Sequence, residues 1–189
     1  MPRKLCKICM HAFVAAIAVT VATTVQALTI AAEGTEGFSV IANGGEVFAT
    51  YQGSSAGYNN DLYFNGTFIF NNYGTAEGTT VSLGSFDAGA ELVFELRVLT
   101  TGYTFFSGPA LRNPDGQAHA RVETDWTTPG TTLVSFEDLF NGAFVFNDLS
   151  FSLSNTSGTP TTPIPEPQTY ALMLAGLAVI KAMTRYRRK

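Results

Sequence analysis

The central part of this 189-residue sequence contains no lysine. Residues 28–166 hold all fifteen acidic residues against Arg97, Arg112 and Arg121, which gives this stretch a formal charge of −12. Residues 1–27 and 167–189 contain no acid and carry +3 and +5. Binding to nucleic-acid phosphates needs lysine and arginine on the folded surface. The acidic, lysine-free body therefore excludes a nucleic-acid-binding protein.

Cysteine and histidine are almost as scarce. Both cysteines, Cys6 and Cys9, precede residue 28, and the rest of the chain holds a single histidine, His119. Residues 28–189 therefore cannot form a disulfide, a Cys/His zinc site or a Cys-His catalytic pair. Stability has to come from packing, and fourteen of the fifteen phenylalanines lie between residues 28 and 154.

A long membrane-spanning run is also missing at the N-terminus. A basic stretch, residues 1–11, precedes an apolar run of 14 residues, 12–25, whereas a spanning helix needs about 20. At the end of this run lie residues of small or moderate size, Val25, Gln26 and Ala27, which suit cleavage by a signal peptidase after Ala27. This order predicts a signal peptide, residues 1–27, removed on export. An uncleaved anchor is the alternative.

The C-terminal part of the chain has three successive features. A Ser/Thr/Pro-rich stretch, residues 155–164, is predicted to be a linker. An apolar segment at about 170–183 follows, interrupted by Lys181, and residues 185–189 are basic. The apolar segment is short for a stable anchor, and the basic end would stay on the cytoplasmic side. We therefore expect a short hydrophobic helix with transient membrane association.

Pro165, Glu166 and Pro167 stand between the linker and the apolar segment. With this motif, the tail resembles the PEP-CTERM sorting signal of Gram-negative bacteria, also labelled "ice-binding protein C-terminal domain", a label that implies no ice binding. The resemblance implies export, membrane retention and processing near the Pro-Glu-Pro motif by an exosortase. The export machinery and the exosortase would be its partners, and the cell surface or an exopolysaccharide-rich biofilm matrix its destination. A plain hydrophobic anchor is the alternative. The hallmark positions are Pro165, Glu166, Pro167, Gly176, Arg187 and Arg188.

The body, residues 28–154, has a hydrophobic period of two. In residues 91–99, Leu92, Phe94, Leu96 and Val98 share one face, and residues 147–154 repeat the pattern. These strands and the turn signals between them predict an all-β fold, a single antiparallel β-sandwich or jelly-roll-like domain. Further strands are expected at 46–51, 61–71, 79–86, 103–106, 118–124 and 131–136.

Catalytic patterns are few. Gly53–Gly57 matches the G-x-S-x-G motif around Ser55, but a nucleophile elbow joins a strand to a helix in an α/β sheet. Along a strand Glu91 and Glu95 would stand ~13 Å apart, too far for glycoside hydrolysis. Glu123 and Asp125 would be ~7 Å apart, an acceptable spacing for glycoside hydrolysis, but two acids on a strand usually form a solvated face. We therefore expect no enzyme activity.

Two late motifs resemble domain-of-unknown-function family 4114, whose members are exported β-rich modules. The stretch Pro109–Val122 and the stretch Leu133–Leu149 carry this resemblance, which covers roughly residues 90–154. It rests mainly on Phe136-Glu-Asp-Leu139 and Phe146-Asn-Asp-Leu149, which have the expected separation.

These two motifs would bring oxygen donors of neighbouring segments together. Oxygen-only donors in an acidic protein suit Ca²⁺ rather than zinc or copper. A second interpretation is favoured, in which the same side chains cap a turn by accepting backbone N–H bonds, because Ala143 and Val145 fill two positions where the family has acids. We therefore expect no obligatory cofactor. The candidate ligands are Glu137, Asp138, Asn147 and Asp148.

The sequence leaves three functions open. The first is an exported, non-enzymatic protein of the cell surface or extracellular matrix. The second is a carbohydrate-binding module, in a calcium-dependent version if the metal is present, with Trp126, Tyr103 or Tyr58 as sugar platforms. The third is a glycan-active enzyme. His119 is expected to be a hydrogen-bonded structural residue.

Overall fold

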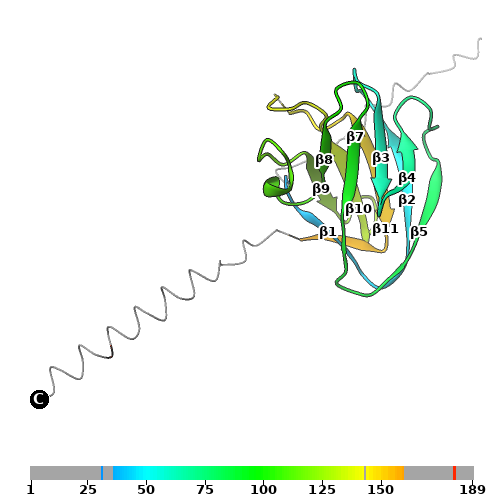
Figure 1. Ribbon diagram of the computed structural model, residues 1–189. Coiled ribbons are helices and arrows are strands. Elements are labelled where there is room, and N and C mark those ends of the chain that lie inside the picture. Colours follow the sequence, from blue (N-terminus) through cyan, green and yellow to red (C-terminus); the bar gives the residue numbers. More distant parts are fainter. Residues whose placement is uncertain (1–30, 32–35, 143, 160–180, 182–189) are drawn as a thin grey trace, which may run out of the picture.

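The computed structural model describes residues 31, 36–142, 144–159 and 181. This part of the chain is all-β with antiparallel strand pairing (Figure 1), as the alternating sequence predicted. The predicted signal peptide, the end of the linker and all of the sorting tail except Lys181 lie outside the described residues. Among the described residues, no helix has the length and apolar character needed to cross a membrane.

Twelve strands form three antiparallel sheets in the described part of the chain. The five-stranded sheet has the order β5 (Thr80–Phe86), β2 (Gly45–Gly53), β11 (Leu149–Ser154), β10 (Thr131–Phe136), β9 (Ala120–Thr124). The four-stranded sheet has the order β4 (Thr67–Asn71), β3 (Asn60–Phe64), β7 (Phe94–Val98), β8 (Thr104–Phe106). The three-stranded sheet has the order β12 (Thr156–Thr159), β1 (Ser39–Ala42), β6 (Glu91–Leu92). A single 3₁₀ turn, η1 (Ala110–Arg112), precedes β9.

Two predicted strands are each divided in the structure. The strand expected at 91–99 separates into β6 and β7, which belong to different sheets. The strand expected at 61–71 is a hairpin of β3 and β4, whose turn residues Asn65 and Gly66 have φ of 49° and 75°. An Asn-Gly pair with both residues at positive φ favours a tight turn between antiparallel strands. The Asn65-Gly66 pair between two apolar stretches was the sequence signal of this turn.

The sequence pattern missed strands β1 and β12, which pair with each other from Ser39↔Thr159 to Ala42↔Thr156. Strand β12 lies inside the predicted linker, so the β domain extends through Thr159 instead of ending at residue 154. The Thr156 hydroxyl is buried, 2.9 Å from the Thr132 hydroxyl. Backbone pairing needs no apolar side chains, and for this reason the polar sequence of β12 gave no strand pattern.

Aromatic side chains join the four-stranded and five-stranded sheets, which lie one in front of the other (Figure 1). The Phe151 ring of β11 lies 4.8 Å from Phe94 of β7 and 6.5 Å from Phe70 of β4, between ring centroids. It also stacks on Phe136 of its own sheet at 6.4 Å. All four rings are fully buried. Aromatic packing thus takes the place of disulfides in this body.

Replacing Phe151 with alanine should lower the free energy of unfolding by about 3–5 kcal/mol, because a large cavity would open between the two sheets. Urea unfolding measures the loss. Leu111→Ala is the control, since Leu111 is 93% exposed and its removal should change stability by no more than about 0.5 kcal/mol. Equal losses in both variants would contradict this description of the core.

Candidate functional site

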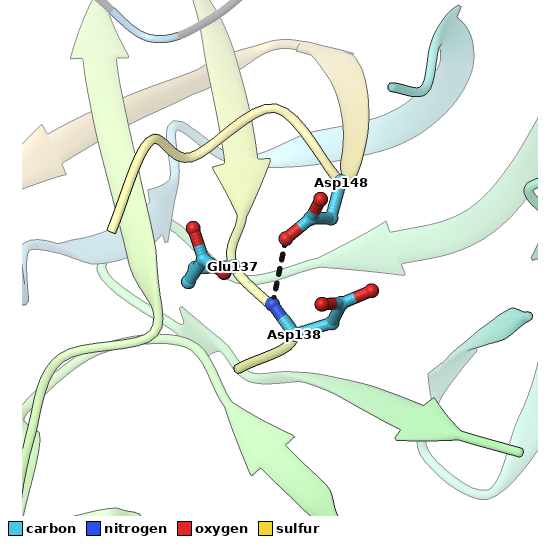
Figure 2. A group of neighbouring side chains, drawn as sticks. All are labelled: Glu137, Asp138 and Asp148. Carbon is cyan, nitrogen blue, oxygen red and sulfur yellow. Dashed lines mark hydrogen bonds between the residues drawn. The ribbon is translucent and has the colours of Figure 1, made fainter. Parts of the chain in front are cut away.

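Three carboxyl groups meet at one end of the five-stranded sheet (Figure 2). Glu137 and Asp138 directly follow β10, and Asp148 directly precedes β11. Because β10 and β11 pair antiparallel up to Phe136↔Leu149, these positions must be neighbours. One oxygen from each of the three side chains lies within 4.8 Å of the others. The residues are only 2%, 3% and 8% exposed.

Two of these carboxylates hold the loop that joins β10 to β11. The Glu137 carboxylate accepts hydrogen bonds from the backbone N–H of Leu139 (3.2 Å), Val145 (2.8 Å) and Phe146 (3.3 Å). The Asp148 carboxylate accepts the N–H of Asp138 at 2.9 Å (Figure 2). The turn-capping interpretation is therefore confirmed for Glu137 and Asp148.

A fourth side chain, Asn60, reaches the cluster from the other sheet. Asn60 is fully buried at the first position of β3, and its Nδ2 donates to Asp138 Oδ2 at 2.8 Å. Its Oδ1 is the single buried side-chain polar atom without a hydrogen-bond partner in the described part of the chain. Sequence reasoning missed Asn60, although it shares the inward face of β3 with Leu62 and Phe64. The alternation of inward and outward residues along β3 was the sequence signal that could have predicted the burial of Asn60.

None of the three arginines of the body pairs with the buried carboxylates, because each is bound to another acid. Arg97 pairs with Glu95 at 2.6 Å, within one strand. Arg112 pairs with Glu91 at 2.8 Å, and Arg121 with Glu36 at 2.8 Å. A buried carboxylate is costly unless it is paired, hydrogen-bonded or neutralised. The arginines of the body therefore do not neutralise the cluster.

Burial determines the protonation of the cluster. It raises the pKa of Asp148 to about 8, and the charges of the neighbouring Asp138 and Glu137 contribute to the shift. Burial also raises the pKa of Asp138, with a further contribution from the Glu137 charge and an opposing one from the Asn60 hydrogen bond. Near neutral pH, a proton on Asp148 therefore relieves part of the repulsion in the ion-free protein.

The remaining predicted ligand, Asn147, is not one of the three clustered carboxylates. Its backbone carbonyl accepts the N–H of Ser55 at 2.8 Å. Ser55 itself lies in the connection between β2 and β3, so the G-x-S-x-G motif lacks the strand-to-helix turn of a nucleophile elbow. The sorting residues Ala27, Pro165, Glu166, Pro167, Gly176, Arg187 and Arg188 lie outside the described residues.

His119 is fully buried beside the cluster and both ring nitrogens are engaged. Nδ1 lies 2.9 Å from the Glu137 carbonyl oxygen, and Nε2 lies 2.9 Å from Asp115 Oδ2. The ring stacks on Phe105 with centroids 3.6 Å apart. A histidine held in this way ties the segment before β9 to the end of β10, in agreement with the predicted structural role.

The three proposed sugar platforms differ in exposure. Tyr58 packs against the core and Trp126 is half-buried. Tyr103 is 42% exposed and stacks on Phe140, which is 37% exposed, with centroids 4.6 Å apart and ring planes at 17°. Phe140 belongs to the β10–β11 loop that the carboxylates hold. The exposed aromatic pair and the buried cluster are thus parts of one end of the molecule.

No family model, curated protein or solved structure matches this chain. The resemblances to the sorting signal and to the family of unknown function stay predictions.

Replacing Asp148 with asparagine should flatten the pH dependence of stability when a chelator is present. In the wild type the folded pKa of about 8 exceeds the unfolded value, so the folded state retains a proton that the unfolded chain loses above pH 4. The free energy of unfolding should therefore fall between pH 4 and pH 8, by at most ~1.4 kcal/mol per pH unit. The asparagine side chain has the shape of the protonated acid and does not titrate. Position 148 of the variant therefore contributes no pH dependence to the free energy of unfolding.

Urea unfolding at pH 5 and pH 8 in EDTA tests this expectation. The free energy of unfolding of Asp148→Asn, relative to that of the wild type, should be higher at pH 8 than at pH 5. A difference that does not change with pH would show that Asp148 titrates normally in the folded protein.

Proposed function

We propose that this chain is an exported, non-enzymatic module of the cell surface or extracellular matrix of a Gram-negative bacterium, processed by an exosortase. The observation that carries the proposal is the order of features along the sequence: a leader, a β body, then Pro165-Glu166-Pro167, an apolar segment and a basic end. We assign the body to the β-sandwich class of jelly-roll type, since the apolar faces of its two larger sheets meet in one core.

The chemistry of the body supports a binding or structural role. The one histidine of residues 28–189 has both nitrogens engaged, and the loop that holds Ser55 joins two strands. The clustered carboxylates are turned inward and hold backbone N–H groups. Groups used in this way stabilise a fold, whereas a general acid or base must reach a substrate.

The charge of the body supports the same destination. A formal charge of −12 over residues 28–166 keeps a protein soluble and attracts cations. A hydrated, cation-rich polysaccharide matrix provides such a setting. Aromatic packing without disulfides also makes the stability of the domain independent of the redox state outside the cell.

Intact-mass measurement on protein from the native host tests the sorting proposal. The mature chain should begin at Leu28, after the cut that follows Ala27, and should lack the segment after about Pro167. A Glu166→Ala variant should keep its tail, because it disrupts the Pro-Glu-Pro motif. Wild-type protein that carries the tail through Lys189 would overturn the proposal.

A second candidate function, carbohydrate binding, is favoured by the Tyr103–Phe140 pair. Exposed, pre-stacked aromatic rings offer flat apolar faces on which sugar rings can pack. Tyr103 is also 6.1 Å from the buried Phe105 ring, which holds it in place. The pair would form one side of a shallow platform at the end of the sheets.

A glycan array probed with residues 28–164, which include every described strand, tests this second candidate. Tyr103→Ala should abolish any binding seen with the wild type, whereas Phe68→Ala, on the exposed side of β4 and 50% exposed, should retain it. Retained binding in Tyr103→Ala would remove the platform. Release of reducing sugar from exopolysaccharide by the same fragment would instead support a glycan-active enzyme.

A further inference from the structure

The buried carboxylate cluster has two independent features that point to a cation as its ligand. The first is charge: three carboxyl groups lie together, and the three arginines of the body are committed to Glu36, Glu91 and Glu95. The second is an orphan atom, Asn60 Oδ1, buried without a partner although Nδ2 of the same carboxamide donates to Asp138. A cation between these oxygens would satisfy both.

The spacing of the donors fits calcium. Ca²⁺ takes six to eight oxygen ligands at about 2.4 Å, so two oxygens on its shell are at most about 4.8 Å apart. One oxygen from each of Glu137, Asp138 and Asp148 meets this limit. Glu137 Oε1 and Asp148 Oδ2 each accept one N–H bond and keep a free lone pair, whereas Glu137 Oε2 accepts two N–H bonds and is left out of the ligand set.

We propose that Glu137, Asp138, Asp148 and Asn60 form a structural calcium site that ties the β10–β11 loop to the first residue of β3. Without Glu137 Oε2, the three carboxylates supply up to five oxygens, and the Asn60 amide supplies another. Such a site goes beyond the proposed function, because it would be present whatever the destination of the protein. Asn60 takes the place of Asn147 in the ligand set expected from the sequence.

The donor chemistry separates Ca²⁺ from other metals. Zinc and copper prefer nitrogen and sulfur ligands, and both nitrogens of His119 are already hydrogen-bonded. Mg²⁺ demands octahedral geometry and keeps several water ligands. Three almost fully buried side chains leave little space for these waters. A calcium ion accepts irregular, mostly protein-derived oxygen ligands.

The site would connect the two larger sheets at the end where the aromatic pair lies. The carboxylates belong to the β10–β11 connection of the five-stranded sheet, and Asn60 belongs to the four-stranded sheet. Leu139 and Phe140 follow the cluster directly and are 38% and 37% exposed. Bound calcium should therefore fix the loop that presents Phe140 to Tyr103, and loss of the ion should loosen it.

Calorimetric titration of the EDTA-treated full chain with CaCl₂, in a non-ionic detergent at pH 8, tests the site. We expect one ion per chain and a dissociation constant of about 10⁻⁴–10⁻³ M, the range of extracellular calcium modules. The melting temperature should rise by about 5 °C at 10 mM CaCl₂. MgCl₂ at the same concentration should give less than half of that rise. No heat together with an unchanged melting temperature would overturn the site.

Matched variants separate ligation from general charge effects. Asp148→Asn should fold cooperatively without metal and lose the calcium-induced rise, and Asn60→Leu should bind calcium at least tenfold more weakly. Asp87→Asn removes an exposed acid in the turn after β5 and should respond as the wild type does. A wild-type calcium response in Asp148→Asn would contradict the site, and one in Asn60→Leu would contradict the role of Asn60.

Limited proteolysis of the unmodified chain provides a test that needs no variant. Chymotrypsin cleaves after exposed leucine and aromatic residues, and Leu139 and Phe140 lie in the loop that calcium would fix. Cleavage there should slow at least severalfold in 10 mM CaCl₂ compared with EDTA, while cleavage after Leu111, on η1, stays the same. Equal rates at the loop in both conditions would contradict the proposed role.

Discussion

The burial of three carboxyl groups at the end of an aromatic core constrains the rest of this structure. A carboxylate without water is strongly destabilising unless hydrogen bonds, protons or a counter-ion satisfy it. The chain satisfies Glu137 with three backbone N–H groups of the loop that follows it and Asp148 with the N–H of Asp138. The β10–β11 loop therefore has its conformation because it supplies donors to buried acids.

The neighbouring polar residues extend the same constraint into the second sheet. The Asn60 N–H donates to Asn72 Oδ1, while Nδ2 of Asn72 donates to the Tyr58 carbonyl and Nδ2 of Asn60 reaches Asp138. The two asparagine-rich segments are thus joined to each other and to the carboxylates. A buried polar network of this kind specifies one register and one sheet-to-sheet arrangement more strictly than apolar contacts do. The one unsatisfied atom in this network, Asn60 Oδ1, is the position at which the proposed calcium ion would complete it.

This arrangement places the proposed calcium ligands and the proposed glycan surface at one end of the domain. The inward carboxylates and Asn60 supply oxygen donors, and the loop they hold presents Phe140 to Tyr103. Residues 28–166 contain neither cysteine nor lysine, and the proposed calcium ion would supply a cross-link that their own side chains do not make. The proposed ion would then act on the stability of the domain and on the surface available to a glycan.

The sequence by itself determined the all-β class, the inward faces of the strands and the scarcity of cations, because these depend on local alternation and composition. Strand β10 has the predicted bounds, and Phe94, Leu96 and Val98 are buried as the pattern required. Glu137, Asp138 and Asp148 were also predicted neighbours, since a short connection between paired strands forces their proximity. Only the tertiary structure decided the contribution of Asn60, which lies 78 residues from Asp138, and the exposure of Tyr103 rather than Tyr58. The alternation of apolar and polar residues predicts on which face of a strand a residue lies. The partner that the residue meets on that face depends on how separate sheets pack, which no local sequence pattern encodes.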